Sequence, residues 1–567
     1  MTRSAPADPP SGTPVTPAQA RLRRPRPDPV VVPQFVLPPT VAARFDARVL
    51  DPSTAVLAPG RPTPTSTVYI AHTLLVRGLP GGSAQEGIDA LTRVAATLDP
   101  PLRVTVSRRD LQVAEILSDS PARRVLDRAW ATRVVLSPAG DGPAGPPDAW
   151  VLLQALRSDP ALADLPVHLE HLLTACASWD GAGYWGSVGY WGSVGYWGSV
   201  GYWGSVGTGL SEYGSPGFGG RTPVVWAAPD PRAGMARPDR PPVVALIDTG
   251  VGHHPWFTHP DGTLRDGVEE KVTYAGQVIG VLPGPDTDPE YLGVVTDPIN
   301  GMVDRDAGHG TFIAGLIRQR CPQAHLLAIP VMPADGAAAE QDVLTALGLL
   351  LARHLDGQAH GRVDELVDVV NLSLGYYDET PATSLDTVPV RQMLEAYAAA
   401  GIAVVAAAGN DATRAPFLPA ALADDVTAGV PMTSVGALNP DSATVALFSN
   451  NGSWITTHAV GAGVVSTVPT TLSGAMGRTI DVDRRDPLPR ATVDPDDYRS
   501  GFAVWSGTSF AAPMIAGDIA AAVAAERAGC ETTTVDPAAD AALVARAVDA
   551  AVAAAQAVID EARARLP

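Results

Sequence analysis

From about residue 241 onward, short continuous apolar runs alternate with segments of helical spacing. The runs are Val243–Asp248, His325–Val331, Val367–Ser373 and Ile402–Ala408. Runs of this kind are typical of strands that are buried on both faces of a sheet. The helical segments between them include Thr311–Arg320, Gln341–His354 and Val390–Ala400. This alternation predicts an α/β domain with a doubly wound, mostly parallel sheet and helices on both of its faces.

Three side chains suited to nucleophilic catalysis lie at the ends of these elements. Asp248 ends the run VVALID, at the sheet edge where active-site residues of open α/β sheets gather. His309 begins a helix and can exchange a proton near neutral pH, and its neighbours Gly308 and Gly310 allow close backbone approach. Ser509 lies in the first turn of a long helix, whose N-terminus offers free N–H groups to a developing oxyanion.

A fourth polar residue, Asn410, follows the apolar run VVAAAG just past a predicted strand end. Its side-chain amide can donate a hydrogen bond to the same oxyanion. Taken alone, Asp248 would fit a metal ligand or a helix cap equally well. Together the four residues predict a catalytic triad of Asp248, His309 and Ser509 with Asn410 in the oxyanion hole.

The motifs DTG, GHGT and SGTS, in that order, resemble the signature of the subtilisin-like serine proteases over about residues 241 to 530. The order Asp, His, Ser is that of subtilisin and differs from those of chymotrypsin and the α/β-hydrolases. The related sedolisins share SGTS but use a Glu and lack the histidine. The resemblance implies a subtilisin-like fold over 241–535 and a serine endopeptidase that acts through an acyl-enzyme, with no cofactor required.

The resemblance also assigns a role to the segment VVNLSLG. Its residues Ser373, Leu374 and Gly375 match the strand that pairs with an extended substrate. In such pairing the backbone hydrogen bonds supply affinity and the side-chain pockets set preference. The expected partner is therefore a peptide or protein substrate.

Two other functions stay open from the sequence. The same triad serves a peptide ligase or macrocyclase, in which an amine replaces water as the acceptor, and exclusion of water from the cleft would decide between them. A catalytically silent binding module on a subtilisin fold is the other alternative. Such proteins usually lose a member of the triad, whereas here every member is present.

The N-terminal part of the chain changes composition at about residue 40. Residues 1–40 are rich in Pro, Ala and Arg and predict a disordered leader. Residues 41–180, called the N-terminal module below, predict a small α+β unit without catalytic spacing. Its expected strands are Thr67–Arg77 and Leu102–Val106, and its expected helices are Ala84–Leu98, 121–130 and 148–157. Many subtilases carry an inhibitory or chaperone-like prodomain at this position, and a partner-binding domain is the competing interpretation.

Residues 181–240 combine a repeat with a linker. Four perfect copies of GYWGSV occupy 183–206, and a Gly- and Pro-rich connector follows. One interpretation is a tandem duplication in a tolerant linker, because loop entropy rises slowly with length. Eight Tyr and Trp in 24 residues are a large apolar load for a solvated segment, however. The repeats are therefore also considered as the enzyme's own substrate or as a partner-binding stripe.

Metal binding is weighed at two places, and no metal site is predicted. The segment between Val468 and Ser506 is acidic. Three interpretations of it are considered: a solvated loop, a calcium site of the kind many relatives carry, and a lid over the cleft. Calcium has no specific motif in its support. The histidines His253, His254 and His259 follow the catalytic Asp, where a His-Pro pair is ordinary for the family. Another long segment, 258–307, carries scattered acids of uncertain role.

The net charge and the cysteine content of the chain restrict the classes of partner and the cellular compartment that are expected. The formal net charge of −20 argues against nucleic acid or an anionic membrane as the main partner. Three widely spaced cysteines give neither a disulfide framework nor a zinc knuckle. No apolar run of signal-peptide length follows the first arginines, so a cytoplasmic location is expected unless a non-classical route exports the chain. The tail, 536–567, predicts an Ala-rich helix that packs on the domain and, because Asp549, Asp560 and Glu561 interrupt it, does not anchor in a membrane.

Overall fold

The computed structural model describes most of the chain. The described residues are 35, 37–140, 145–175, 221–296, 299, 301, 303–380, 388–426, 428–474, 497–528 and 534–566. The GYWGSV repeats, nearly all of the predicted leader and most of the acidic segment between Val468 and Ser506 lie outside these residues. The predictions made for them stay predictions.

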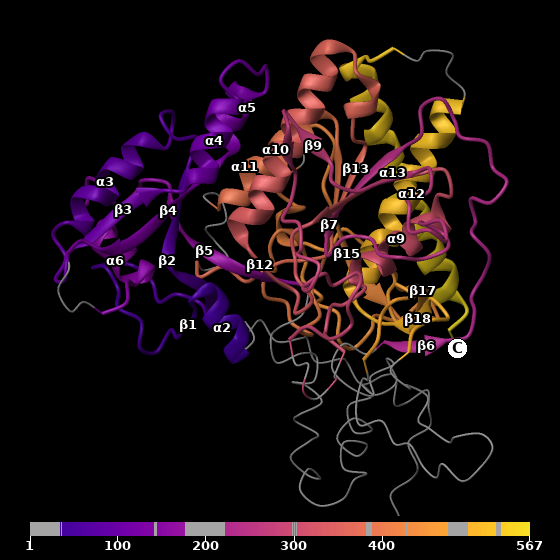
Figure 1. Cartoon of the computed structure of the whole chain (residues 1–567), viewed down its shortest axis with the longest axis horizontal. Coiled ribbons are helices and arrows are strands. Elements are labelled where there is room, and N and C mark those ends of the chain that lie inside the picture. Colours follow the sequence, from indigo (N-terminus) through magenta and orange to yellow (C-terminus); the bar gives the residue numbers. More distant parts are fainter. Residues whose placement is uncertain are drawn as a thin grey trace, which may run out of the picture.

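A seven-stranded parallel sheet forms the centre of the larger part of the protein (Figure 1). Its order is β16-β15-β14-β13-β7-β11-β8. The bounds are β7 (Val243–Asp248), β8 (Val268–Glu269), β11 (His325–Pro330), β13 (Val369–Leu372), β14 (Ala403–Ala407), β15 (Thr433–Leu438) and β16 (Thr457–Val460). From β7 the chain goes first to the edge strand β8, then to β11 between β8 and β7, and then to β13 on the other side of β7. The carboxyl end of β7 is thus a topological switch point, where open α/β sheets place their ligands.

Helices cover both faces of this sheet, as the alternating pattern predicts. They are α9 (His309–Arg320), α10 (Glu340–His360), α11 (Pro389–Ala400), α12 (Thr508–Ala528) and α13 (Pro537–Ala564), with short 3-10 turns at Val363–Glu365 and Ala420–Leu422. Helix α12 crosses β13, β14, β15 and β16, and it also packs on α9 and α13. Helices α10 and α11 pack against each other on the opposite side of the sheet (Figure 1).

Two smaller pieces of sheet flank the main one. Strands β17 (Val464–Thr467), β18 (Phe502–Trp505) and β6 (Thr222–Val224) form an antiparallel sheet that leads directly into α12. Strands β9 (Thr273–Tyr274) and β10 (Gln277–Val278) form a short antiparallel pair.

The N-terminal module is an antiparallel sheet with helices, as expected from its pattern. Its strands are β1 (Ala47–Leu50), β2 (Thr67–Arg77), β3 (Leu102–Val106), β4 (Ala131–Pro138) and β5 (Val167–Thr174). Its helices are α2 (Pro39–Phe45), α3 (Gln85–Ala95), α4 (Arg108–Ile116), α5 (Arg123–Ala129) and α6 (Ala149–Arg157). Helices α3 and α6 pack together on the sheet, around a core that includes Leu74, Leu91 and Leu153, each fully buried.

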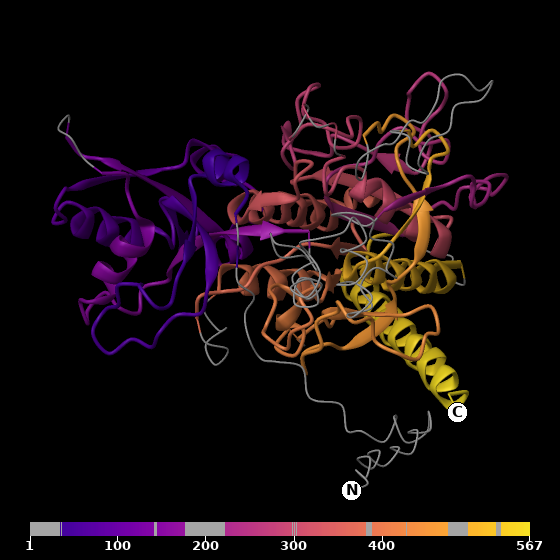
Figure 2. The same ribbon diagram turned by 90° about the horizontal axis from the view of Figure 1, so that it is seen from below.

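Strand β5 extends from the N-terminal module into the larger part of the protein (Figure 2). Its first half pairs with β2, and its last residues, Leu172 to Thr174, pair antiparallel with β12 (Ala337–Ala339). Strand β12 therefore joins the module's sheet although it lies more than 160 residues further along the chain. The sequence pattern did not predict this strand, because three alanines carry no periodicity.

A packed interface continues from β12 between the two parts. Trp130, at the end of α5, is 1% exposed, and its indole Nε1 donates to Asp110 Oδ1 at 2.9 Å. Its ring lies against α10 at Gly348, where an added Cβ would come within 2.3 Å of a ring carbon. Burial raises the pKa of Asp110 to about 6, although the bond from Trp130 opposes the rise. Close packing of this kind fixes the module on the larger part rather than leaving it on a flexible tether.

Local signals explain where the helices differ from their sequence-based bounds. Helix α10 continues past His354 to His360 and stops at Gly361, which adopts the left-handed conformation with φ of 68°. Helix α3 is shorter than predicted and ends at Ala95. The end of α10 follows ordinary helix-stop chemistry, with Gly in the left-handed conformation just past the end.

Two described helices are long and apolar enough to cross a membrane by length and composition alone. They are α12, with a mean hydropathy of 1.4, and α13, with 1.7. Core helices of globular domains satisfy the same criterion. Helix α12 is two-thirds buried inside the protein and packs on the central sheet, and α13 lies along α12.

Candidate active site

The structure brings Asp248 and His309 into direct contact. Asp248 is the last residue of β7 and His309 the first of α9, and both are almost fully buried. His309 Nδ1 lies 2.8 Å from Asp248 Oδ1, which also accepts a bond from the Thr249 N–H at 2.8 Å. Burial, the largest single effect, opposes the charged imidazolium, but Asp248, with smaller contributions from Asp306 and Glu290, raises the pKa of His309 above its usual 6.5. Asp248 thus orients the ring and favours its protonated form.

This contact depends on how closely α9 approaches the loop after β7. An added Cβ at Gly310 would lie 2.1 Å from the Gly250 carbonyl oxygen, so any larger residue would push His309 away from Asp248. Gly308 adopts a positive φ of 77° at the start of α9. The two flanking glycines therefore serve the close approach that the sequence predicted for them.

Ser509 is the second residue of α12 and is 2% exposed. Its hydroxyl donates to the Ser373 carbonyl at 3.4 Å, and within the described residues it makes no hydrogen bond to His309. The next residue, Phe510, packs its ring 5.3 Å from the His309 imidazole, so the start of α12 lies beside the histidine. A rotation of the serine side chain would be needed to aim the hydroxyl at the ring; nucleophile–base contacts are often loose before substrate binds.

Asn410 lies just past β14 and turns its amide in a defined direction. Its Oδ1 accepts from the Thr508 N–H and from Thr508 Oγ1, both at 2.8 Å. This pairing leaves Nδ2 as a donor, and a Cβ added at Gly507 would lie 3.5 Å from that nitrogen. The amide N–H₂ therefore faces the start of α12, where the Ser509 N–H has no carbonyl one turn earlier in the helix. Sequence reasoning did not single out Thr508, which fixes this orientation.

A buried carboxyl group, Glu290, connects the two sides of the Asp248–His309 pair. It is 3% exposed and accepts bonds from the hydroxyls of Thr249 and Thr311 and, at 3.1 Å, from the Gly310 N–H. Thr249 follows Asp248 and Gly310 follows His309, so one side chain bonds to the segments of both predicted site residues. Burial raises the pKa of Glu290 from 4.5 to about 8, against the opposing effect of the threonine bonds. Sequence reasoning missed Glu290 because it stands in the irregular segment 258–307, where no periodicity or motif marks it.

The predicted substrate strand is already paired. Thr174 N donates to Gly375 O and Gly375 N donates to Thr174 O, both at 2.9 Å. Thr174 also pairs with Ala337, so the end of β5 lies between β12 and Gly375 as a central strand. Ser373 lies two residues before Gly375, and its carbonyl oxygen accepts the hydrogen bond from the Ser509 hydroxyl. The Ser373 hydroxyl in turn donates to the Ser509 carbonyl oxygen at 2.9 Å. Leu374 is buried in the core of the domain.

After the segment that contains the repeats, the described chain resumes at Arg221, near His309. Arg221 is fully buried, with its guanidinium 4.7 Å from the Trp505 ring and a bond to the Arg305 carbonyl at 2.9 Å. Trp505 in turn lies edge-on to His309, with ring centres 5.6 Å apart. The described residues before and after the segment that contains the repeats therefore both reach this region, Thr174 at Gly375 and Arg221 at Trp505.

The structure describes only some of the residues that the sequence analysis considered as metal ligands. His254 is buried, and its Nδ1 accepts from the Trp256 N–H at 3.1 Å. Burial lowers the pKa of His254 to about 3. Most of the acidic segment considered for calcium lies outside the described residues.

Comparison with known proteins agrees with this architecture. The subtilase family profile matches residues 239–558, which include the main sheet and the four predicted site residues. The chain belongs to the subtilase family. It is similar to the thermophilic serine proteinase of Bacillus sp. (strain AK1), with 27% identity over 225 residues. The aligned stretch covers 40% of this chain and 45% of that relative, so the chain spans less than half the relative's length.

Proposed function

We propose that the protein is a serine endopeptidase. The observation that carries the proposal is the meeting of four side chains from four elements at the carboxyl end of β7: Asp248 bonded to His309, Ser509 at the start of α12, and the Asn410 amide turned toward it. Family membership and the similarity to a serine proteinase support the same conclusion. Among the functions open from the sequence, a silent binding module does not require these groups in this arrangement.

The residues divide the chemistry between them. Ser509 Oγ attacks the scissile carbonyl while His309 Nε2 takes its proton and then delivers it to the leaving amine. Asp248 holds the Nδ1–H tautomer and stabilises the imidazolium. The Asn410 Nδ2 and the Ser509 N–H donate to the oxyanion of the tetrahedral intermediate. Water then attacks the acyl-enzyme and regenerates the serine.

The test is labelling with a fluorophosphonate, which phosphonylates an activated serine, together with hydrolysis of an unstructured peptide. We expect the wild-type chain to react and Ser509→Ala to lose both signals. Ser506→Ala, three residues away in the same motif, is the matched control and should keep them. Labelling of Ser509→Ala equal to that of wild type would reject Ser509 as the nucleophile.

We further infer that the N-terminal module inhibits the enzyme in cis, in the manner of a prodomain. The support is the end of β5, which occupies the backbone positions of Gly375 that an extended substrate would use. A competing peptide must displace Thr174 from between β12 and Gly375 before it can pair there. This favours an inhibitory role over the partner-binding interpretation.

The GYWGSV repeats are proposed as a substrate of the same site. The support is that the described residues next to the 45-residue segment reach the site region: Thr174 pairs with Gly375, and Arg221 lies 4.7 Å from the Trp505 ring beside His309. Intact-mass analysis of wild-type and Ser509→Ala chains tests this. Products cut within 183–206 in wild type alone would support it, hydrolytic and ring-closed products differing by one water. Repeats that stay intact while other peptides are cut would refute it.

A further inference from the structure

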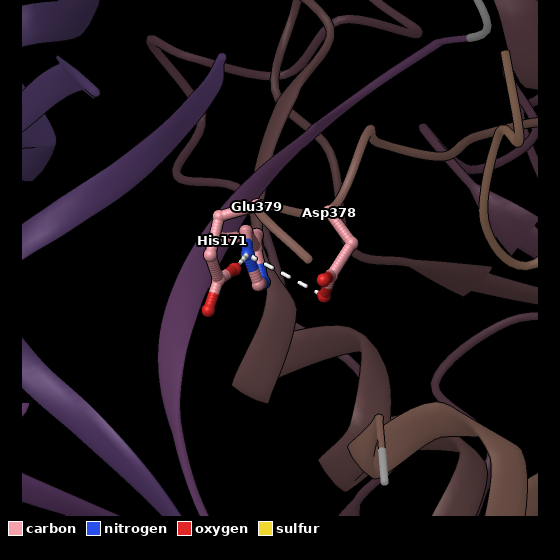
Figure 3. A group of neighbouring side chains, drawn as sticks. All are labelled: His171, Asp378 and Glu379. Atoms are coloured by element: carbon pink, nitrogen blue, oxygen red, sulfur yellow. Dashed lines mark hydrogen bonds and ion pairs between the residues drawn. The ribbon is translucent and has the colours of Figure 1, made fainter. Parts of the chain in front are cut away.

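A buried histidine and two carboxylates meet where β5 contacts the larger part of the protein (Figure 3). His171 comes from β5, and Asp378 and Glu379 follow the segment that holds Gly375. The three side chains are no more than 8% exposed, and one ligand atom from each lies within 4.8 Å of the others. None of them takes part in the proposed catalytic mechanism.

Each carboxylate has one oxygen held by the protein and the other turned toward His171. Asp378 Oδ1 accepts from the Thr380 N–H at 2.7 Å, while Oδ2 lies 3.9 Å from His171 Nε2. Glu379 Oε1 lies 3.9 Å from Arg157, while Oε2 lies 2.8 Å from the same His171 nitrogen. Nε2 is therefore the point on which both free oxygens converge.

The opposite nitrogen of the ring is held by a third carboxylate. His171 Nδ1 lies 2.8 Å from Glu340 Oε2, and Glu340 Oε1 accepts from the Tyr376 hydroxyl at 2.9 Å. The Tyr376 ring also stacks on the imidazole, with centres 4.5 Å apart. A carboxylate that accepts from one imidazole nitrogen leaves the lone pair on the other, as in the carboxylate–histidine–metal arrangement of many metalloproteins.

Charge balance in this buried space is compatible with a divalent cation. When all three are ionised, the carboxylates of Glu340, Asp378 and Glu379 carry three negative charges, and Arg157 contacts Glu379 with one positive charge. The two remaining negative charges are costly to bury unpaired, and burial beside Glu379 raises the pKa of Asp378 to about 7. Two protons, one on His171 and one on Asp378, would cancel both charges, and a divalent cation would do the same in their place.

We propose that His171 Nε2, Asp378 and Glu379 bind one divalent cation of the zinc class. Imidazole and carboxylate ligands suit this class, whose bonds of about 2.0–2.2 Å place tetrahedral ligand atoms about 3.4 Å apart. The separations of 2.8 and 3.9 Å from Nε2 bracket that value. Water would complete the coordination.

The position of the ion gives it a structural consequence. His171 belongs to the N-terminal module and lies three residues before Thr174, whereas Asp378 and Glu379 lie three and four residues after Gly375. The ion would clamp the two strands that pair across the substrate site. This consequence rests on the proposed inhibition by the module, but the binding of the ion does not.

The experiment measures metal content in the full-length Ser509→Ala chain, which cannot cut itself. After incubation with zinc chloride and desalting, elemental mass spectrometry should find about one zinc per chain. His171→Gln and Asp378→Asn should each lose it. His168→Gln is the matched control, because His168 is also buried on β5 but makes no contact with these carboxylates within hydrogen-bonding distance. Cobalt should give the visible absorption of a tetrahedral site in the chain and the control only.

Folding and binding are separated by a second readout. Zinc should raise the Tm of the Ser509→Ala chain and of its His168→Gln form, but not that of its Asp378→Asn form. The proposal is overturned if the chain retains no stoichiometric metal, which would leave His171 as an imidazolium between Glu340 and Glu379. It is also overturned if His171→Gln binds as much zinc as the control, which would place the ion elsewhere. Neither result bears on whether Ser509 is a nucleophile.

Discussion

Thr174 and Gly375 exchange two backbone hydrogen bonds of 2.9 Å across the junction between the N-terminal module and the subtilase domain. Antiparallel pairing fixes direction as well as contact. The chain that enters past Gly375 runs toward Ser373, whose carbonyl accepts the hydroxyl bond of Ser509. The module is thus joined to the domain along the strand on which substrate pairing is proposed.

This pairing predicts where self-cleavage begins. The two strands of an antiparallel pair run in opposite directions, so a chain that continues past Thr174 advances toward Ser373 and Ser509. The peptide bonds that first reach Ser509 therefore lie about two or three residues beyond Thr174. N-terminal sequencing of the product from wild-type protein should therefore find a new terminus shortly after Ala175. A first cut within residues 41–170 would contradict the register.

Weakening the same pairing should activate the enzyme. Thr174→Pro removes the N–H that donates to Gly375, whereas Thr174→Ala keeps it and is the matched control. We expect Thr174→Pro to react faster than the control with a fluorophosphonate, because the substrate strand is vacated more often. Equal labelling rates, with both variants folded by circular dichroism, would show that the module does not restrict access.

Substitutions of the proposed triad residues should lower kcat by unequal factors. His309→Ala should lower kcat by about 10⁶-fold, a magnitude taken from subtilisin, and Asp248→Asn by about 10⁴-fold, taken from chymotrypsin-type proteases. The difference arises because His309 transfers the proton, whereas Asp248 acts through the orientation and charge of the ring. Steady-state hydrolysis of an unstructured peptide measures both values. Full activity of His309→Ala would exclude it as the base.

Activity should rise with pH as His309 loses its proton. The Asp248 carboxylate raises the pKa of His309 above 6.5 despite burial, so half-maximal kcat/KM is expected above that pH. In Asp248→Asn the largest of the raising effects is removed, and the acidic limb of the residual activity should move to lower pH. A limb that stays in place would mean that another group controls it.

Asn410 should act on the transition state rather than on binding. Asn410→Leu should lower kcat by about 10²–10³-fold, or about 3–4 kcal/mol, the size known for the corresponding donor of subtilisin. KM should change little, because the oxyanion forms only after attack. An effect confined to KM would show that the amide does not contact the oxyanion.

Glu290 should make stability fall with rising pH. Its pKa is about 8 in the folded protein and 4.5 ordinarily, so between these values the folded state holds a proton that the unfolded chain has lost. The stabilisation is full below pH 4.5 and is lost as pH rises through 8. In the Ser509→Ala background, Glu290→Gln removes this titration, so Tm should decline less from pH 5 to pH 8. Parallel declines in the two chains would contradict the raised pKa.

Replacement of Glu290 should also distinguish positioning from charge. Gln preserves acceptor and donor atoms toward Thr249 and Thr311, whereas Ala removes them. We expect Glu290→Gln to keep most of the wild-type kcat and Glu290→Ala to lower it. If both retain the wild-type kcat and pH profile, Glu290 has no positioning role.

The sequence by itself determined four strands of the central sheet and the set of candidate site residues. The apolar runs that became β7, β11, β13 and β14 are buried on both faces, so their pattern survives without knowledge of their neighbours. Asp248, His309 and Ser509 stand in short motifs whose glycines and helix start are local properties. The contact between Asp248 and His309 could be expected because the motifs fall at element ends on one edge of a parallel sheet.

Only the tertiary structure decided which distant segments meet. Strand β12 is three alanines and pairs with β5 because of where the module docks, which no local periodicity encodes. Glu290 reaches Thr249 and Thr311 from an irregular segment, and His171 reaches Glu340 and Glu379 from about 170 and 210 residues away. Helix and strand propensities and the spacing of apolar residues depend only on residues that are close together in the sequence. Contacts between segments far apart in the chain depend on packing of the whole molecule, and the buried carboxylates of this protein acquire their partners only there.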